Sequence, residues 1–424
     1  MMISSERRFC MKKVVDFIAD NWKNVIRENR EDEDTLIGLP YKYTVSCAEG
    51  MFRELYYWGT YFTNIGLILS GNTELAQNNI DDMTYLISQY GFMPNGNRTF
   101  FLDRSQPPFL SQMIVELYAV TKDLEWLKDK YKSLKTEYEF WKERRMTPSG
   151  LNRFYGEIPN REAAVQFGRY MCKRFAMEVP SDEAVLEEYG KAMYSFAESG
   201  WDCTSRYGLE PHHYNSLELN CMLYNLEKNL SFIATEIGSD KSPAWEEKAS
   251  IRKNKMQELM WNDKQGFFAD YNFVTKKQND IAATSTFYPL FVGLADEKQA
   301  VGIHAALYKI EEEYGLASTE KRDDLYDLQW DHPYGWPCQQ YIVIQGLLNY
   351  GYREDAIRLA RKYKDTVERN FKKTGNLWEK YNVCTGGVTN NKEYDTPPIM
   401  GWAAAAYLYC VHLLEAEDVL TQNR

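Results

Sequence analysis

Helical periodicity that returns along most of the chain is the feature that most limits its fold. In residues 10–26, Val14, Ile18 and Trp22 follow one another at four-residue intervals, which places them on one face of a helix. Comparable patterns occupy residues 55–69, 79–90, 110–118, 124–144, 183–196, 217–237, 245–261, 300–314, 339–350, 353–371 and 400–414. About a dozen helices with short connectors predict an all-α protein. Residues 266–281 alternate aromatic and polar side chains and predict one small hairpin or an extended loop.

The chain shows no boundary that would divide it into parts. No Pro- or Gly-rich linker and no exact repeat is visible, so residues 1–424 are expected to form one domain. A dozen helices can pair as hairpins around a ring, which gathers the connecting loops at one end. We therefore expect a pocket among the polar, aromatic and glycine-rich connectors.

Composition narrows the classes of ligand. Aromatic residues make up 15% of the chain, with 31 Tyr and 11 Trp, and such rings suit both a polyhydroxylated ligand and a large helical core. The net charge of −11 is spread without a basic block, which argues against nucleic acid as a partner.

Location is predicted from the N-terminus and the cysteines. The first 22 residues mix charges into their apolar positions, so they resemble no signal peptide, and no apolar run reaches the length of a membrane span. The eight cysteines are scattered without a CxxC pair, which favours reduced thiols. These observations predict a cytoplasmic protein that does not contact a membrane, and they leave its oligomeric state open.

Aromatic, acid-bearing connectors are the candidate functional segments. They are residues 49–62, 93–108, 197–207, 328–340 and 377–402. Aromatic walls with Asn, Gln, Arg and carboxylates are typical of a carbohydrate pocket, and cleavage of a glycoside needs two carboxyl groups. Asp202 and Glu393 are candidates because each lies in such a connector. Either could instead cap a helix or pair with a neighbour.

Other chemistries have weaker signals. His212 and His213 are adjacent and are followed by Glu218, without the i, i+4 histidine spacing of common zinc motifs. No GxSxG elbow, phosphate-binding loop or GxGxxG turn is present. We expect no metal ion and no cofactor.

Several motifs carry a family resemblance. "FRELYYW", "GFMPNGNRTFFLDRSQPP", "AESGWDCTSR", "QWDHPYGW" and a "KEY" followed by "GW" together resemble the trehalase family of glycoside hydrolases. The resemblance implies an (α/α)6 barrel that hydrolyses α,α-trehalose to two glucose molecules with inversion. It also implies a small-molecule carbohydrate as the partner of this chain.

The resemblance also assigns roles to residues. Asp202 would be the general acid, and Glu393, nine residues before Trp402, would be the general base. Inverting chemistry requires about 6.5–9.5 Å between the two carboxyl groups. Arg206 would support the acid loop. The expected substrate-binding residues are Phe52, Tyr56, Trp58, Asn95, Arg104, Arg161, Gln329, Trp330, Asp331, Trp336 and Trp402.

The chain departs from the family pattern at a few positions. Met51 stands where the signature has Arg, Gly59 where it has Asp, and Tyr334 where it has Asn, while Arg161 is shifted by one position from a family arginine. Each lost charged partner of a substrate hydroxyl would weaken binding by about 1.5–3 kcal/mol. Two alternatives to trehalose hydrolysis therefore stay open: hydrolysis of another small α-glycoside, and sugar binding without turnover.

Overall fold

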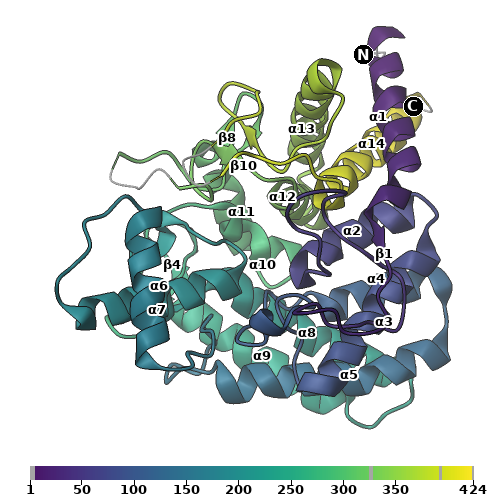
Figure 1. The fold of residues 1–424 in the computed structure, drawn as a ribbon. Helices are drawn as coiled ribbons and strands as arrows, with labels where there is room; N and C mark the ends of the chain where they lie inside the picture. Colours follow the sequence, from purple (N-terminus) through teal and green to yellow (C-terminus); the bar gives the residue numbers. More distant parts are fainter. Residues whose placement is uncertain (1–4, 324–327, 391–393, 423–424) are drawn as a thin grey trace.

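Six inner helices form a closed ring in the computed structural model, which describes residues 5–323, 328–390 and 394–422 (Figure 1). Each inner helix contacts the next, and the last contacts the first. In ring order they are α2 (Tyr57–Leu69), α4 (Leu110–Thr121), α8 (Leu217–Glu236), α10 (Tyr288–Phe291), α12 (Pro337–Asn349) and α14 (Gly401–Gln422).

Six outer helices pack around this ring. They are α1 (Ser5–Asn21), α3 (Thr73–Tyr90), α5 (Leu124–Arg144), α9 (Ser242–Leu259), α11 (Glu297–Ala305) and α13 (Arg353–Thr374). Among their contacts, α3 lies on α2, α9 on α8 and α13 on α12, and α1 lies on α13. The predicted (α/α)6 barrel is confirmed.

Burial explains which helices lie inside the ring. Every residue from Tyr57 to Leu67 of α2 is buried, whereas α13 buries only one face. Small residues let α2 and α14 approach closely, because a Cβ added at Gly66 would lie 3.0 Å from Ala405 Cα. Inner helices therefore need apolar or small residues all round, and outer helices need a single apolar stripe.

Two further helices form a hairpin beside the ring: α6 (Arg161–Arg174) and α7 (Glu183–Ser199) (Figure 1). Glycines allow the two helices to pack closely. A Cβ at Gly168 would collide with Leu186 O, and one at Gly190 would collide with Ala164 O. The sequence analysis missed α6. It predicted a helix at 300–314, but α11 ends at Ala305, a 3-10 turn follows over Ala306–Lys309, and residues 311–316 then form a short hairpin.

Strands are only two residues long in the described part of the chain. The predicted hairpin exists: β6 (Tyr271–Asn272) pairs with β7 (Lys277–Gln278) and with β3 (Tyr214–Asn215), beside the pair β4 (Trp261–Asn262) and β5 (Phe267–Phe268). The other antiparallel pairs are β1 (Ile26–Arg27) with β2 (Tyr43–Thr44), β8 (Glu311–Glu312) with β9 (Gly315–Leu316), and β10 (Tyr334–Gly335) with β11 (Tyr381–Asn382). Among the helices of the described ranges, none combines the length and hydrophobicity that a membrane crossing requires.

Candidate active site

A cavity of about 370 Å³ lies where the connectors that precede α2, α4, α12 and α14 meet the α6–α7 hairpin. This volume falls within the range of small-molecule sites. Its lining consists of Ser46, Phe52, Tyr56, Trp58, Gly59, Asn95, Phe101, Arg104, Gln106, Phe167, Tyr170, Arg174, Met193, Ala197, Gly200, Asp202, Trp330, Trp336, Glu379, Tyr394, Ile399 and Trp402. The predicted gathering of aromatic connectors at one end of the ring is therefore observed.

The loop that carries Asp202 leaves α7 through a glycine. Gly200 has a φ of +72°, and a Cβ there would lie 2.8 Å from Trp58 Nε1. Glycine is required both for the left-handed turn and for this close approach. The next backbone N–H, of Trp201, donates to Ser199 Oγ at 3.1 Å. The turn directs Asp202 into the cavity.

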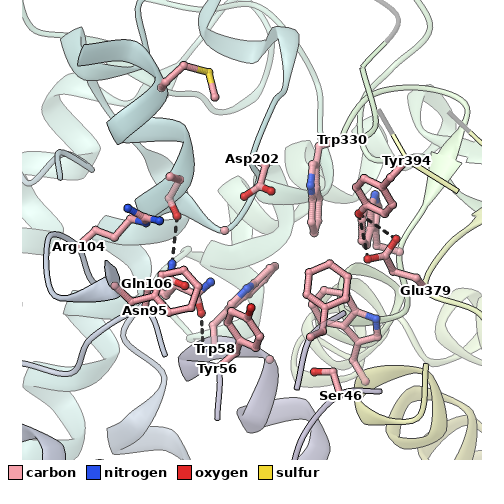
Figure 2. Close-up of a pocket in the computed structure, with 18 of the residues that line it drawn as sticks. Ser46, Tyr56, Trp58, Asn95, Arg104, Gln106, Asp202, Trp330, Glu379 and Tyr394 are labelled. Carbon is pink, nitrogen blue, oxygen red and sulfur yellow. Dashed lines mark hydrogen bonds between the residues drawn. The ribbon is translucent and has the colours of Figure 1, made fainter. Parts of the chain in front are cut away.

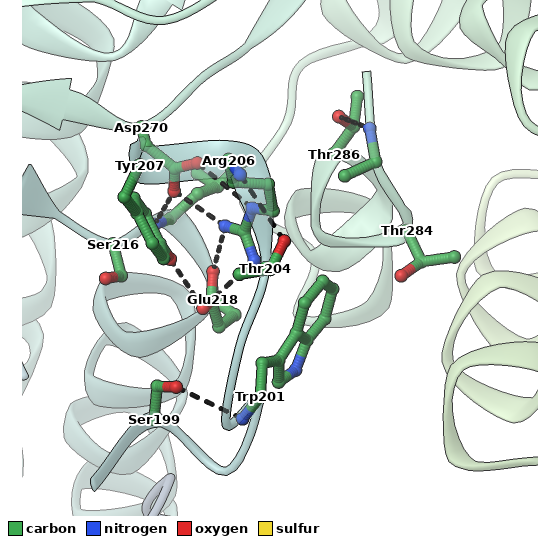
Figure 3. A network of polar contacts seen from close by, with 12 residues as sticks. Ser199, Trp201, Thr204, Arg206, Tyr207, Ser216, Glu218, Asp270, Thr284 and Thr286 are labelled. Atoms are coloured by element: carbon green, nitrogen blue, oxygen red, sulfur yellow. Dashed lines mark hydrogen bonds and ion pairs between the residues drawn. The ribbon is translucent and has the colours of Figure 1, made fainter. Parts of the chain in front are cut away.

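The acid loop is anchored by a buried cation (Figure 3). Arg206 Nη2 lies 2.7 Å from Glu218 Oε2 and 2.8 Å from Asp270 Oδ1, and all three side chains are buried. Burial opposes the charge, yet the two carboxylates hold the pKa of Arg206 well above its ordinary value. The Arg206 guanidinium also stacks over the Trp201 ring at 4.5 Å. Arg206 is therefore positioned to hold the acid loop, which is the role that the resemblance implies.

A stack of indoles continues from this anchor into the cavity. Trp201 stacks on Trp330 with 5.5 Å between ring centroids, and Trp330 stacks on Trp336 at 3.8 Å with nearly parallel planes. Trp330 and Trp336 line the cavity. These contacts cover ring faces of both indoles, so the stack forms a rigid wall of the cavity.

Asp331 secures the acid loop from behind. Its buried carboxylate accepts hydrogen bonds from Thr204 Oγ1 at 2.9 Å and from Ser205 N at 3.0 Å. Burial raises the pKa of Asp331 to about 6 in spite of these bonds. Asp331 is absent from the cavity lining, so it positions the loop and does not face the cavity.

Asp202 itself is accessible. Its side chain is 48% exposed, and Oδ2 lies 3.6 Å from Arg174 Nη2 of α6. In Figure 2, Asp202 and Glu379 lie on either side of the Trp330 ring. A carboxyl group in this position can reach a ligand without any movement of the backbone.

Glu379 is the second carboxyl group of the lining, and it is 2% exposed. Lys380 Nζ lies 2.6 Å from Oε2, and the Tyr394 hydroxyl donates to the carboxylate at 3.0 Å. Burial raises the pKa of Glu379, and Lys380 opposes this shift. The sequence analysis missed Glu379, although "LWEKY" lies within a connector that it had selected.

The opposite wall comes from the connectors before α2 and α4. Phe52 has a φ of +58°, which for a bulky residue costs about 1–3 kcal/mol of strain. Its ring packs edge-on against Tyr56 and Tyr394. Asn95 Nδ2 donates to Ala197 O at 3.2 Å, and Gln106 Oε1 accepts from Trp58 N at 3.2 Å. These bonds tie the wall to α7 and to the start of α2.

The cavity gathers most of the residues predicted from the sequence. Lining it are Phe52, Tyr56, Trp58, Asn95, Arg104, Asp202, Trp330, Trp336 and Trp402. Arg161 lies outside it, since Arg161 begins α6 and pairs with Glu183 and Glu187 on the surface. Gln329 is buried behind Trp336, to whose Nε1 its carbonyl oxygen is bonded. Glu393 lies outside the described residues.

Of the three departures from the family pattern, one reaches the cavity. Gly59 lines the wall, and a Cβ there would lie 3.9 Å from the Trp402 ring, which is an ordinary van der Waals contact. Met51 is 44% exposed, and Tyr334 is buried in β10. The sequence analysis also missed Arg174, because it missed the helix that carries it.

A ring of paired helices whose aromatic cavity holds an accessible carboxyl group and a second, buried one is the arrangement of a glycoside hydrolase. The chain belongs to the trehalase family, whose family model matches residues 3–415. This membership implies a small carbohydrate as substrate.

Curated relatives agree with this family, and solved structures share its fold. The chain is 32% identical over 428 residues to the periplasmic trehalase of Xanthomonas axonopodis pv. citri, covering 94% of this chain and 72% of the relative. It is 31% identical over 414 residues to the periplasmic trehalase of Salmonella paratyphi A, covering 91% and 70%. Neutral trehalase Nth1 from Saccharomyces cerevisiae superposes with a TM-score of 0.81 at 23% identity, over 96% of this chain and 94% of that one. The GH63 mannosylglycerate hydrolase from Thermus thermophilus superposes with a TM-score of 0.65 at 16% identity, over 95% and 100%.

The predicted cytoplasmic location is contradicted by the two bacterial relatives, which are named periplasmic trehalases. The prediction had rested partly on scattered, reduced cysteines. Among the described cysteines, seven are free, and six of these are buried. Packing protects a buried thiol in any compartment, so its reduced state does not report location.

Proposed function

We propose that residues 1–424 form one catalytic domain that hydrolyses α,α-trehalose to two glucose molecules in the periplasm. Family membership and the names of the curated relatives support the substrate and the location. The observation that carries the proposal is the presentation of Asp202, accessible and held by the Arg206–Trp201 anchor, to an aromatic cavity of small-molecule size.

In the proposed reaction, Asp202 is the general acid and Glu393 the general base. Asp202 donates its proton to the glycosidic oxygen as the bond from that oxygen to the anomeric carbon breaks. A water molecule on the opposite face gives a proton to Glu393 and bonds to the anomeric carbon, so the configuration inverts. The assignment of Glu393 rests on the sequence resemblance.

Glu379 is the alternative candidate for the general base. It faces the cavity, and its neighbours Lys380 and Tyr394 can hold it in one orientation. We assign it to binding a sugar hydroxyl, because Lys380 and the Tyr394 hydroxyl already hold its carboxylate.

The test is glucose release from trehalose, with the anomer of the first-formed product followed by NMR. Asp202→Asn and Glu393→Gln should each lower kcat by about 100- to 10,000-fold. Glu379→Gln should mainly raise KM, and Glu210→Gln, an exposed carboxylate near the same loop, should change neither constant. β-Glucose should form together with α-glucose. Near-normal kcat in Asp202→Asn would refute the assignment of the acid, and loss of kcat in Glu379→Gln with normal kcat in Glu393→Gln would make Glu379 the base.

Hydrolysis of another small α-glycoside is a second candidate, favoured by one observation. Gly59 leaves the wall beside Trp402 without the carboxylate of the family signature. A sugar that lacks the matching hydroxyl, or carries a larger group there, would fit this wall. A panel of α-glucosides and related glycosides, compared by kcat/KM with trehalose, distinguishes the two candidates.

A further inference from the structure

Three segments far apart in the sequence meet outside the cavity. They contribute Glu312 from β8, His332 from the connector before β10, and Cys384 from the turn after β11. Backbone hydrogen bonds fix their relative positions, because Val383 N donates to Pro333 O at 3.0 Å and Tyr314 N donates to Val383 O at 2.9 Å. The three side chains are therefore brought together by the fold.

The polar side-chain atoms of Glu312, His332 and Cys384 lie close to one another. His332 Nε2 lies 3.0 Å from Glu312 Oε1 and 3.3 Å from Cys384 Sγ. The candidate ligand atoms of all three residues lie within 4.8 Å of one another. A nucleophilic triad would use opposite ring nitrogens for the thiol and the carboxylate. Here Nε2 alone faces both the thiol and the carboxylate, which is the arrangement expected of three ligands around one metal ion.

The distances are close to those that a zinc ion needs. With tetrahedral angles, Zn–N of about 2.0–2.1 Å, Zn–S of about 2.3 Å and Zn–O of about 2.0–2.2 Å, ligand atoms would be about 3.4–3.6 Å apart. The observed 3.0 and 3.3 Å are a few tenths shorter, so small side-chain rotations would open the space. The side chains of His332 and Glu312 are 15% and 33% exposed, which lets water complete the coordination.

Nearby cations leave this carboxylate available. Arg358 and Lys362 are held by the carboxylate of Glu311, the residue before Glu312. The hydrogen bond from Lys362 Nζ to Glu312 goes to its backbone oxygen, at 2.8 Å. Thiolate, imidazole and carboxylate together are a ligand set that suits zinc and excludes calcium and magnesium.

We propose that Glu312, His332 and Cys384 bind one zinc-type divalent cation, with water as the remaining ligand. On binding, the Cys384 thiol loses its proton to the solvent and its sulfur bonds to the metal. The ion would join β8, the connector that carries Trp330 and Trp336, and the turn after β11. It takes no part in the proposed hydrolysis.

The test is metal binding by the purified, chelator-treated full chain. Zn²⁺ titration should give one site and raise the unfolding temperature, and Co²⁺ should give the near-ultraviolet charge-transfer band of a thiolate ligand. Cys384→Ser and His332→Asn should weaken Zn²⁺ binding by at least about tenfold and abolish the Co²⁺ band. His213→Asn is the matched control, since Glu188, His212 and His213 form the other group with ligand spacing in the described residues.

Each outcome decides the proposal. Loss of the band in both variants, with binding kept in His213→Asn, supports the site. Unchanged Zn²⁺ affinity in Cys384→Ser refutes it, and so does loss of binding in His213→Asn alone. Glycosidase activity without metal in Cys384→Ser, a residue outside the cavity lining, shows that the variant is folded.

Discussion

The substitution Arg206→Met tests whether the acid loop depends on its buried anchor. It would leave the carboxylates of Glu218 and Asp270 without their cation, in side-chain positions that are 1% and 3% exposed. Removing one partner of a buried ion pair costs about 3–5 kcal/mol. We expect a loss of this size in the free energy of unfolding, measured by urea denaturation.

Activity should fall as well, because Trp201 loses the cation stacked on it and no longer fixes the direction of Asp202. A displacement of about 1 Å at a catalytic group can lower the rate about 100-fold. We expect kcat to fall by about this factor, measured by glucose release well below the unfolding midpoint, with a smaller change in KM.

The chain offers a matched control in Arg252→Met. Arg252 is also buried, and its Nη2 lies 2.9 Å from the buried carboxylate of Glu227. This pair joins α9 to α8, and neither residue lines the cavity. Arg252→Met should therefore lower stability by a similar amount and leave kcat within about threefold of the original. If the two variants lost stability alike and both kept kcat, the anchor would be structural only, and our reasoning about the acid loop would be wrong.

Three other predictions follow from single positions. Gly200→Ala should destabilise the fold by about 1–3 kcal/mol and lower activity, because its Cβ would press on Trp58 at a positive φ; unchanged kinetics and unfolding midpoint would contradict this. Burial raises the pKa of Glu137 to about 7 from an ordinary 4.5, so the folded state holds this proton more tightly than the unfolded state does. The stability that this proton contributes is complete below pH 4.5 and is lost as the pH rises through 7. Relative to Glu137→Gln, the original chain should lose about 3 kcal/mol of unfolding free energy over that window, measured by urea denaturation at a series of pH values. Parallel pH curves for the two chains would refute this. Gly59→Asp should raise kcat/KM for trehalose, because it restores the carboxylate of the family signature at a position where a Cβ meets no close contact. A folded variant without gain would mean that specificity is set elsewhere.

Much of the fold could be predicted because helical periodicity is a local property. The inner helix α14 shows this in its run of four alanines between Trp402 and Tyr407, which suits a helix packed closely against another. The miss at α6 has a local cause too. Charged residues occupy both of its ends, and in this segment only Arg161 was considered, as the counterpart of a family arginine.

The candidate site was predicted in part. Short motifs predicted Asp202, the two tryptophans of the 328–340 connector and the wall before α2. Each of these lies in a motif whose residues are contiguous in the chain, so the motif can be read from the sequence. Glu379 was overlooked since nothing in "LWEKY" reports whether its carboxylate faces solvent, core or cavity. Its burial and its contact with Tyr394, 15 residues away, depend on how the 377–402 connector folds back on itself.

The sequence by itself determined the helical class, the family and the loops that carry the chemistry. The tertiary structure alone decided which charges meet: Arg206 pairs with Asp270, 64 residues away, Asp331 holds the loop at Ser205, 126 residues away, and Glu312 and Cys384 both meet His332. The physical reason is one of range. Periodicity and turn residues act over a few positions, whereas ion pairs, stacked rings and ligand groups form only after the ring of helices has closed and fixed distant connectors against one another.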